Sequence, residues 1–176
     1  MRTSTSWMGG NETAEDPRIV NDRPADPGVS SEPLSPVSLV IPCRAEHVAL
    51  CRLVVGAIAM RDGLDEDVAA DLKVIVTEAC NCFLAMSSAT HPAPAGTGEA
   101  APAIAGCSLR MDFDSKPGVF AISVFYPGQH GLLSWLEGCE PMSQAGLGLT
   151  ILKALTSELV EQADDEGAVL RLTRTL

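Results

Sequence analysis

Apolar residues recur at strand and helix spacings along the second part of the chain. Residues 37–41 follow an alternating pattern and are rich in β-branched side chains, which predicts a strand that Pro42 ends. Apolar positions at helical spacing then predict a helix over residues 45–60 and a second helix over 65–86. The acids that begin the second helix suit the positive end of its dipole.

The remaining elements are shorter and are separated by segments rich in glycine and proline. Residues 87–105 and 126–145 have no clear period and are expected to be long loops. The other expected elements are strands over 107–113 and 119–125 joined by a turn at 114–118, a helix over 147–155, and strands over 158–162 and 168–173. Helices and strands are thus segregated, which predicts an α+β fold. We expect a two-layer sandwich, with a mixed or antiparallel sheet and helices on one face.

The first 36 residues differ in composition from the rest. They are rich in proline, serine, aspartate and glycine, and such a segment buries too little surface to offset its ordering entropy. We therefore expect residues 1–36 to be a disordered tail and residues 37–176 to form one domain.

The charge balance excludes one class of partner. The chain carries 12 Lys and Arg against 23 Asp and Glu, a formal net charge of −11. Nucleic-acid binding needs a basic surface, so it is not expected; the acidity favours a basic protein partner or solubility alone. Apolar runs long enough for a membrane span or a signal peptide are missing, so we expect a cytoplasmic protein without a membrane span.

Six cysteines are present, and most stand inside apolar runs. A chain of this length does not need disulfides, and a cytoplasm would keep the thiols reduced, so we expect them to act as small hydrophobic residues. Cys80 and Cys82 resemble a metal pair, but helix residues two apart point in different directions, which disfavours a shared metal.

Glu78 is the first candidate functional residue. It follows a nearly continuous aliphatic run in the second helix, and helical spacing places it on one stripe with Asp71, Ile75 and Cys82. A carboxylate at the edge of an apolar stripe is costly to bury without a partner. Glu78 is therefore either a solvated boundary residue or an acid or base at a ligand pocket.

A glycine turn opens the helix over 147–155. Gly146 and Gly148 flank Leu147, and glycines at a helix start leave backbone amides open to phosphate. The same glycines could instead allow close packing of the helix. Both interpretations remain open at this point.

The two segments together resemble the anti-sigma factor and serine kinase family of the bacterial partner-switching systems. That family belongs to the histidine-kinase-like ATPases, whose fold is of the Bergerat type. The run Thr77-Glu78-Ala79-Cys80-Asn81-Cys82 stands where the family has Glu-Ala-(Cys or Val)-Thr-Asn, and residues 146–155 match its Gly-x-Gly-Leu helix. The resemblance covers residues 37–176 in order and spacing.

The resemblance implies a nucleotide site with specific contacts. Glu78 would be the catalytic base, and Asn81 would contact the nucleotide and bind Mg²⁺, with ATP as the cofactor. Further nucleotide contacts would come from Gly128, Gly146, Leu147, Gly148 and Leu149.

Two positions depart from the family pattern. Cys82 stands where the family has the Mg²⁺-binding Asn, and Asn81 is one residue early, a rotation of about 100° on a helix that only a local shift such as a π-bulge would correct. Tyr126 stands where the family has the Asp that binds adenine, and we expect its side chain to intrude into the cleft.

The resemblance implies a protein that binds and sequesters a sigma factor and is controlled by an antagonist of the STAS type. The departures at Cys82 and Tyr126 imply that its ATP binding is reduced or absent. Two alternatives remain: a working serine/threonine kinase that phosphorylates the antagonist, and an ATP-binding signalling module without a sigma partner. The family often dimerises, so a homodimer is also an expectation.

Overall fold

The computed structural model describes residues 36–90, 107–126, 131–163 and 167–176. The predicted tail over residues 1–36 therefore lies, except for Pro36, outside the described residues. The helices are the 3₁₀ turn Ala45–His47, α1 (Val48–Arg61), α2 (Glu66–Thr90), α3 (Leu132–Glu137) and α4 (Gln144–Leu155). The strands are β1 (Val37–Pro42), β2 (Ser108–Lys116), β3 (Val119–Tyr126), β4 (Glu158–Ala163) and β5 (Ala168–Thr175).

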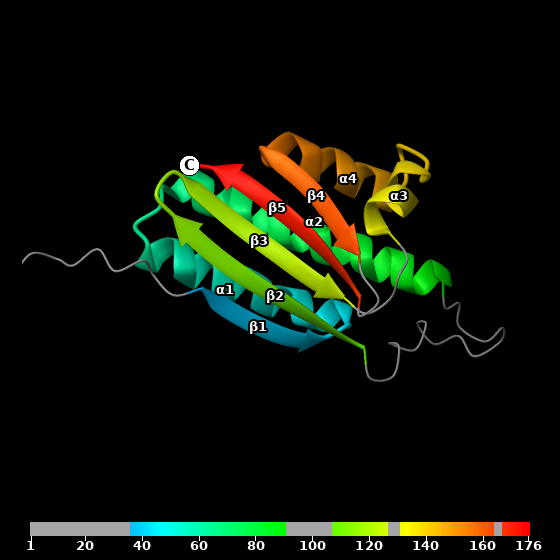
Figure 1. Cartoon of the computed structure of the whole chain (residues 1–176), viewed down its shortest axis with the longest axis horizontal. Coiled ribbons are helices and arrows are strands. Elements are labelled where there is room, and N and C mark those ends of the chain that lie inside the picture. Colours follow the sequence, from blue (N-terminus) through cyan, green and yellow to red (C-terminus); the bar gives the residue numbers. More distant parts are fainter. Residues whose placement is uncertain (1–35, 91–106, 127–130, 164–166) are drawn as a thin grey trace, which may run out of the picture. The chain divides into compact units, whose positions relative to one another are not determined.

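The five strands form one sheet in the order β1-β2-β3-β5-β4, and every neighbouring pair is antiparallel (Figure 1). β2 and β3 form a hairpin in which Lys116 pairs with Val119, so the turn is tighter than predicted. Gly118 supplies the φ of +79° that this turn requires, a conformation that glycine adopts without steric cost.

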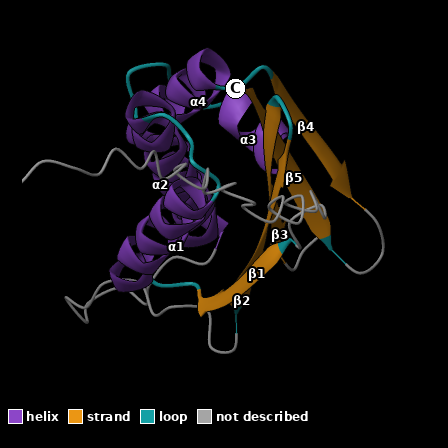
Figure 2. Cartoon of the chain, turned by 90° about the vertical axis from the view of Figure 1, so that its left-hand side faces the viewer, coloured by secondary structure: helices purple, strands orange, loops and turns teal. Residues whose placement is uncertain are grey.

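The helices lie on one side of the sheet, so the domain that contains them has two layers (Figure 2). β2 illustrates why: Leu109, Met111 and Phe113 are buried toward the helices, whereas Ser108 and Arg110 point to the exposed face. The guanidinium of Arg110 stacks over the Phe125 ring on that exposed face, 3.7 Å from its centroid. The predicted α+β sandwich is confirmed, and its sheet is antiparallel.

Two helices begin or end outside their predicted limits. α2 continues to Thr90, four residues past the predicted end. α4 begins at Gln144, three residues before its predicted start, because the Ser143 hydroxyl caps it by accepting a hydrogen bond from the Gly146 amide.

α3 lies inside a segment that was predicted to be a loop, so that part of the prediction is wrong. Leu132 and Leu136 are one helical turn apart and both are buried, which provides the apolar stripe of a short helix. Gly138 follows directly after its last residue. Glycines and prolines around this single turn concealed the period in the sequence.

Cys43 and Cys107 form a disulfide with their Cα atoms 5.6 Å apart, so the prediction of reduced cysteines is wrong for this pair. The antiparallel register explains the pairing. Pro42 lies opposite Ser108, which makes Cys43 and Cys107 the next opposing residues. The Cys43 amide also donates to the Cys107 carbonyl oxygen at 3.1 Å.

Within the described ranges, none of the helices combines the length and apolar character needed to cross a bilayer.

Candidate functional site

The candidate site lies where α2 packs against α4. α2 is an uninterrupted α-helix, and Glu78 and Cys82 lie one turn apart on the side that faces α4. A Cβ atom built on Gly148 would lie 2.7 Å from the Cys82 Sγ atom and 3.3 Å from the Glu78 Oε2 atom. The helix that carries Glu78 is therefore in direct contact with the glycine-rich start of α4. Gly148 permits this contact because it has no side chain.

Gly146 has a similar packing role on the other side of α4. A Cβ atom there would lie 2.3 Å from the Glu140 carbonyl oxygen, closer than any real contact. The Gly146 amide donates to the Ser143 hydroxyl at 3.1 Å, and the Leu147 amide donates to the Ser143 carbonyl oxygen at 2.9 Å. Both amides are thus already hydrogen-bonded within the protein, and the close-packing interpretation applies to both glycines.

Cys82 is buried, and its thiol is directed at the Ala145 carbonyl oxygen, 3.9 Å away. Burial raises the pKa of the Cys82 thiol to about 12, and the negative charge of the nearby Glu78 carboxylate adds to this shift. The thiol is therefore neutral at physiological pH. A neutral thiol is a poor ligand for Mg²⁺, which prefers hard oxygen donors.

The other predicted contact residues that the structure describes lie on α2 and α4. Asn81 is half-buried on α2, and because the helix continues without a π-bulge it keeps its rotation away from the stripe of Glu78. In α4, Leu149 is buried whereas Leu147 is 44% exposed. Gly128 lies outside the described residues.

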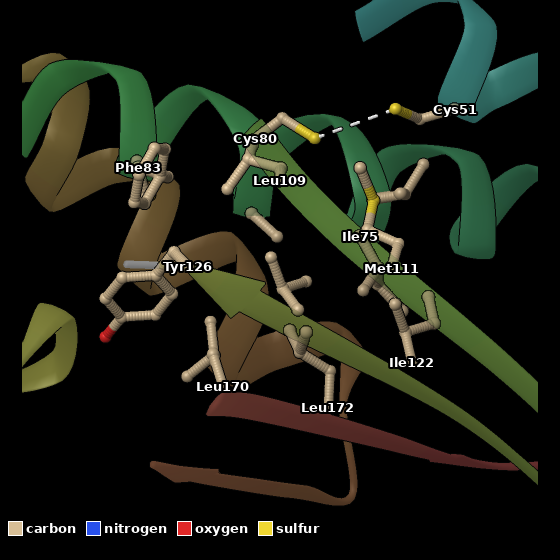
Figure 3. Close-up of a cluster of buried hydrophobic side chains, with 14 of the residues drawn as sticks. Cys51, Ile75, Cys80, Phe83, Leu109, Met111, Ile122, Tyr126, Leu170 and Leu172 are labelled. Carbon is tan, nitrogen blue, oxygen red and sulfur yellow. Dashed lines mark hydrogen bonds between the residues drawn. The ribbon is translucent and has the colours of Figure 1, made fainter. Parts of the chain in front are cut away.

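Tyr126, the last residue of β3, is buried beside α2 and α3 (Figure 3). Its ring packs against Phe83, with the ring centroids 5.1 Å apart, and its hydroxyl donates to the Glu161 carboxylate. Glu161 also accepts the Leu132 amide at 2.6 Å and the Leu133 amide at 3.0 Å. The Glu161 carboxylate therefore caps the first turn of α3 and holds the Tyr126 hydroxyl next to that turn.

Sequence reasoning missed this Glu161 cap. The missed signal was the register of β4, because Glu161 shares the inward face of that strand with Leu159, beside Leu170 of β5. A charged residue on an otherwise apolar inward face needs a partner, and here the partners are one phenol and two helix amides. Burial, followed by the bond to Glu161, raises the pKa of Tyr126 well above its ordinary value.

The two cysteines of the Cys80-Asn81-Cys82 run face different elements. The Cys80 thiol points to Cys51 of α1, whereas the Cys82 thiol points to α4. The part of the chain that the structure describes holds no group of three or more His, Cys, Asp or Glu residues placed to bind a metal ion.

Comparison with known proteins shows the family to which the domain belongs. The model of the histidine kinase-like ATPase domain matches residues 41–174. The serine-protein kinase RsbW of Bacillus cereus (strain AH187) is 26% identical over 152 residues, covering 78% of this chain and 83% of that protein. RsbW of Halalkalibacterium halodurans is 27% identical over 150 residues, covering 80% of this chain and 83% of that protein.

Among solved structures, the crystal structure of the SiaB–SiaC complex from Pseudomonas aeruginosa contains a chain of similar fold. The TM-score is 0.54 at 12% sequence identity, over 78% of this chain and 88% of that chain. This likeness concerns the fold alone. Since the family model spans well over half of the sequence, the chain belongs to the family of histidine kinase-like ATPase domains.

Proposed function

We propose that this protein is an anti-sigma regulator that binds and sequesters a sigma factor and is released from it by an antagonist of the STAS type. The observation that carries the proposal is the direct contact of the Glu78 helix with the Gly146–Gly148 helix start, within a match to serine-protein kinases RsbW that spans 83% of their length. The net charge of −11 suits a partner with basic DNA-binding surfaces.

The second part of the proposal is that ATP binding is weakened or lost. The ATPase family implies ATP with Mg²⁺, and the contacts would come from Glu78, Asn81, Gly128 and the start of α4. The residues present fit this ligand poorly. Cys82 offers a neutral thiol in place of an oxygen donor, Tyr126 is bonded to Glu161, and the Gly146 amide is bonded to Ser143.

An active kinase is the second candidate. Glu78 supports it, because this carboxylate is half-buried and lies next to the Gly148 backbone, where a general base of phosphoryl transfer would be placed. The relatives that match are serine-protein kinases by name. The third candidate, a nucleotide-binding signalling module without a sigma partner, shares the fold but needs no protein substrate.

Calorimetry with Mg-ATP separates the first two candidates. We expect the wild-type protein to bind weakly or not at all, and the double variant C82N/Y126D to bind more tightly, because it supplies an amide oxygen for Mg²⁺ and a carboxylate for adenine. C139A, a thiol change outside the α2–α4 contact, is the control. Micromolar wild-type binding together with phosphate transfer to a STAS protein would reject the weakened-nucleotide proposal in favour of the kinase.

Pull-down with purified sigma factors tests the partner class. The anti-sigma proposal expects a complex that a STAS protein dissociates, and binding should survive removal of residues 1–36. If none of the host's sigma factors binds, the signalling-module candidate replaces it. Sedimentation of the same samples tests the expected homodimer, and fractionation of cells tests the proposed cytoplasmic location.

A further inference from the structure

Cys51 of α1 and Cys80 of α2 face one another inside the helix layer. Their Sγ atoms are 4.0 Å apart, and the Cys80 thiol donates to the Cys51 sulfur (Figure 3). Both side chains have a relative exposure of 0%. The two thiols therefore form a contact pair that the proposed sigma and nucleotide chemistry does not use.

The remaining thiols have other contacts. Cys82 is directed at the Ala145 carbonyl oxygen of α4, and Cys139 donates to the Trp135 carbonyl oxygen at 3.4 Å. Neither forms a sulfur–sulfur contact of this kind in the described part of the chain. Cys51 and Cys80 are thus the only free cysteines there that could be joined by a small movement.

The geometry of the pair favours covalent closure. A disulfide has its sulfurs about 2 Å apart, so each Sγ atom needs to move by about 1 Å toward the other. The hydrogen bond also makes the two thiols unequal. It lowers the pKa of the Cys51 thiol, and, together with burial, it raises the pKa of the Cys80 thiol. Cys51 is therefore the thiol that reaches the nucleophilic thiolate form first.

We propose that Cys51 and Cys80 form an oxidisable dithiol site, which a hydroperoxide converts to a disulfide that joins α1 to α2. The Cys51 thiolate attacks the peroxide oxygen, the O–O bond breaks, and Cys51 becomes a sulfenic acid while hydrogen peroxide yields one water. The Cys80 sulfur then attacks the Cys51 sulfur, the S–S bond forms, and the S–O bond breaks with loss of a second water. Two thiols are oxidised by two electrons and one peroxide is reduced.

The position of the pair gives this reaction a structural consequence. Cys80 lies between Glu78 and Cys82, whose side chains contact α4. A bond from Cys80 to α1 would fix this part of α2 to the first helix on the side opposite α4. Because both thiols are fully buried, the oxidant reaches them only through a local opening of the helix layer.

Peptide mass mapping of the full-length protein tests the proposal. After mild treatment with hydrogen peroxide, a non-reducing digest is expected to contain a peptide pair linked through Cys51 and Cys80, two hydrogens lighter than the separate peptides. The thermal midpoint of the oxidised protein is expected to rise. Dithiothreitol is expected to break the link, and in C43S/C107S, where it has no other disulfide to reduce, it should return the midpoint to its starting value.

Variants at matched positions make the result specific. C51A and C80A are each expected to lose both the link and the rise in midpoint, while C139A keeps them. A link from Cys51 or Cys80 to another cysteine, irreversible oxidation of either residue without a link, or no link at any peroxide concentration that leaves the protein folded would each overturn the proposal. If C51A or C80A folds poorly, the peptide map of the wild-type protein still shows whether the Cys51–Cys80 link forms.

Discussion

The Sγ atom of Cys82 lies 2.7 Å from the point that a Cβ atom on Gly148 would occupy. We therefore predict that G148A loses about 1–3 kcal/mol of stability, because the added methyl group overpacks the contact between α2 and α4. The double variant C82A/G148A is expected to recover part of this loss, since it removes the sulfur that the methyl group meets. Urea denaturation of the single and double variants measures the coupling.

Gly56 offers a matched control in α1. A Cβ atom there would meet only the Cε atom of Lys73, at 2.9 Å, and this flexible side chain can move aside. G56A should therefore be neutral or gain up to about 1 kcal/mol from the better helix propensity of alanine. For the Gly148 test, the stability changes of C82A and G148A should not simply add in the double variant. If they do add, the contact between Cys82 and Gly148 is contradicted.

Gly146 is expected to be less tolerant than Gly148. The obstacle to a methyl group at Gly146 is the Glu140 carbonyl oxygen at 2.3 Å, a backbone atom that no side-chain truncation removes. G146A should thus destabilise the protein more than G148A, and C82A should not rescue it. The same urea curves test this, and rescue of G146A by C82A would show that the start of α4 packs differently.

The titration of Tyr126 should reveal the Glu161 cap. Tyr126 is the only tyrosine in the chain, so tyrosinate absorbance reports this residue alone. Its pKa is raised in the folded state, so the stability that the neutral phenol contributes is present below its unfolded pKa of about 10 and is lost as the pH rises above it. In the folded protein we expect no tyrosinate signal until well above that pH.

Two comparisons make this test specific. The protein in guanidinium should titrate with a midpoint near the ordinary value for tyrosine. The free energy of unfolding of Y126F should fall less steeply at alkaline pH than that of the wild-type protein. Some decrease should remain, because the pKa of Cys82 is also raised and its ionisation also destabilises the folded state. A normal tyrosine titration in the folded wild-type protein would rule out the buried contact with Glu161.

Arg174 joins three elements through two hydrogen bonds. Its guanidinium donates to the Asp71 carboxylate at 2.6 Å and to the Leu155 carbonyl oxygen at 2.8 Å. The Arg174 and Asp71 side chains are 28% and 32% exposed, so solvent weakens the pair, and R174A should cost about 1–2 kcal/mol. R174K should restore only part of this, because one ammonium group lacks the fork of the guanidinium.

An exposed ion pair provides the control for Arg174. Lys153 and Glu137 are 3.2 Å apart and both are more than half exposed, so K153A should change stability by less than about 0.5 kcal/mol. Thermal denaturation of the three variants is the measurement. Equal effects of R174A and K153A would mean that the Arg174 bonds are not formed in solution.

Reduction of the Cys43–Cys107 disulfide should destabilise the domain. The bond closes a loop with a sequence separation of 64, for which chain entropy gives about 4 kcal/mol. The midpoint of unfolding should fall in dithiothreitol, whereas C43S/C107S should start lower and not respond. Thiol counting in denaturant without reductant should find four free thiols, and a count of six would contradict the bond.

Much of the fold follows from the sequence, because the relevant signals are local. Strand patterns and turn residues predicted all five strands to within a few residues, and the turn residues around Gly118 predicted that β2 and β3 are consecutive strands joined by a turn. α3 was missed because a helix of six residues is too short for its apolar positions to repeat along the sequence. Its stability comes from the tertiary burial of Leu132 and Leu136.

The candidate site was predictable only where residues share a helix. Spacing along α2 placed Glu78 and Cys82 together, and the glycine pattern indicated that something approaches α4 closely. The Cys43–Cys107 and Tyr126–Glu161 contacts join residues 64 and 35 positions apart. Such contacts depend on strand order and register, which single-sequence patterns do not provide.

The disulfide has one more consequence, which concerns the covalent path of the chain. Cys43 precedes α1 and Cys107 follows α2, so both long helices lie within the ring of chain that the bond closes. A protease that cuts once anywhere between these two cysteines opens the ring but releases no fragment. The nicked protein should remain one molecule in electrophoresis without reductant and separate into two bands only when the disulfide is reduced.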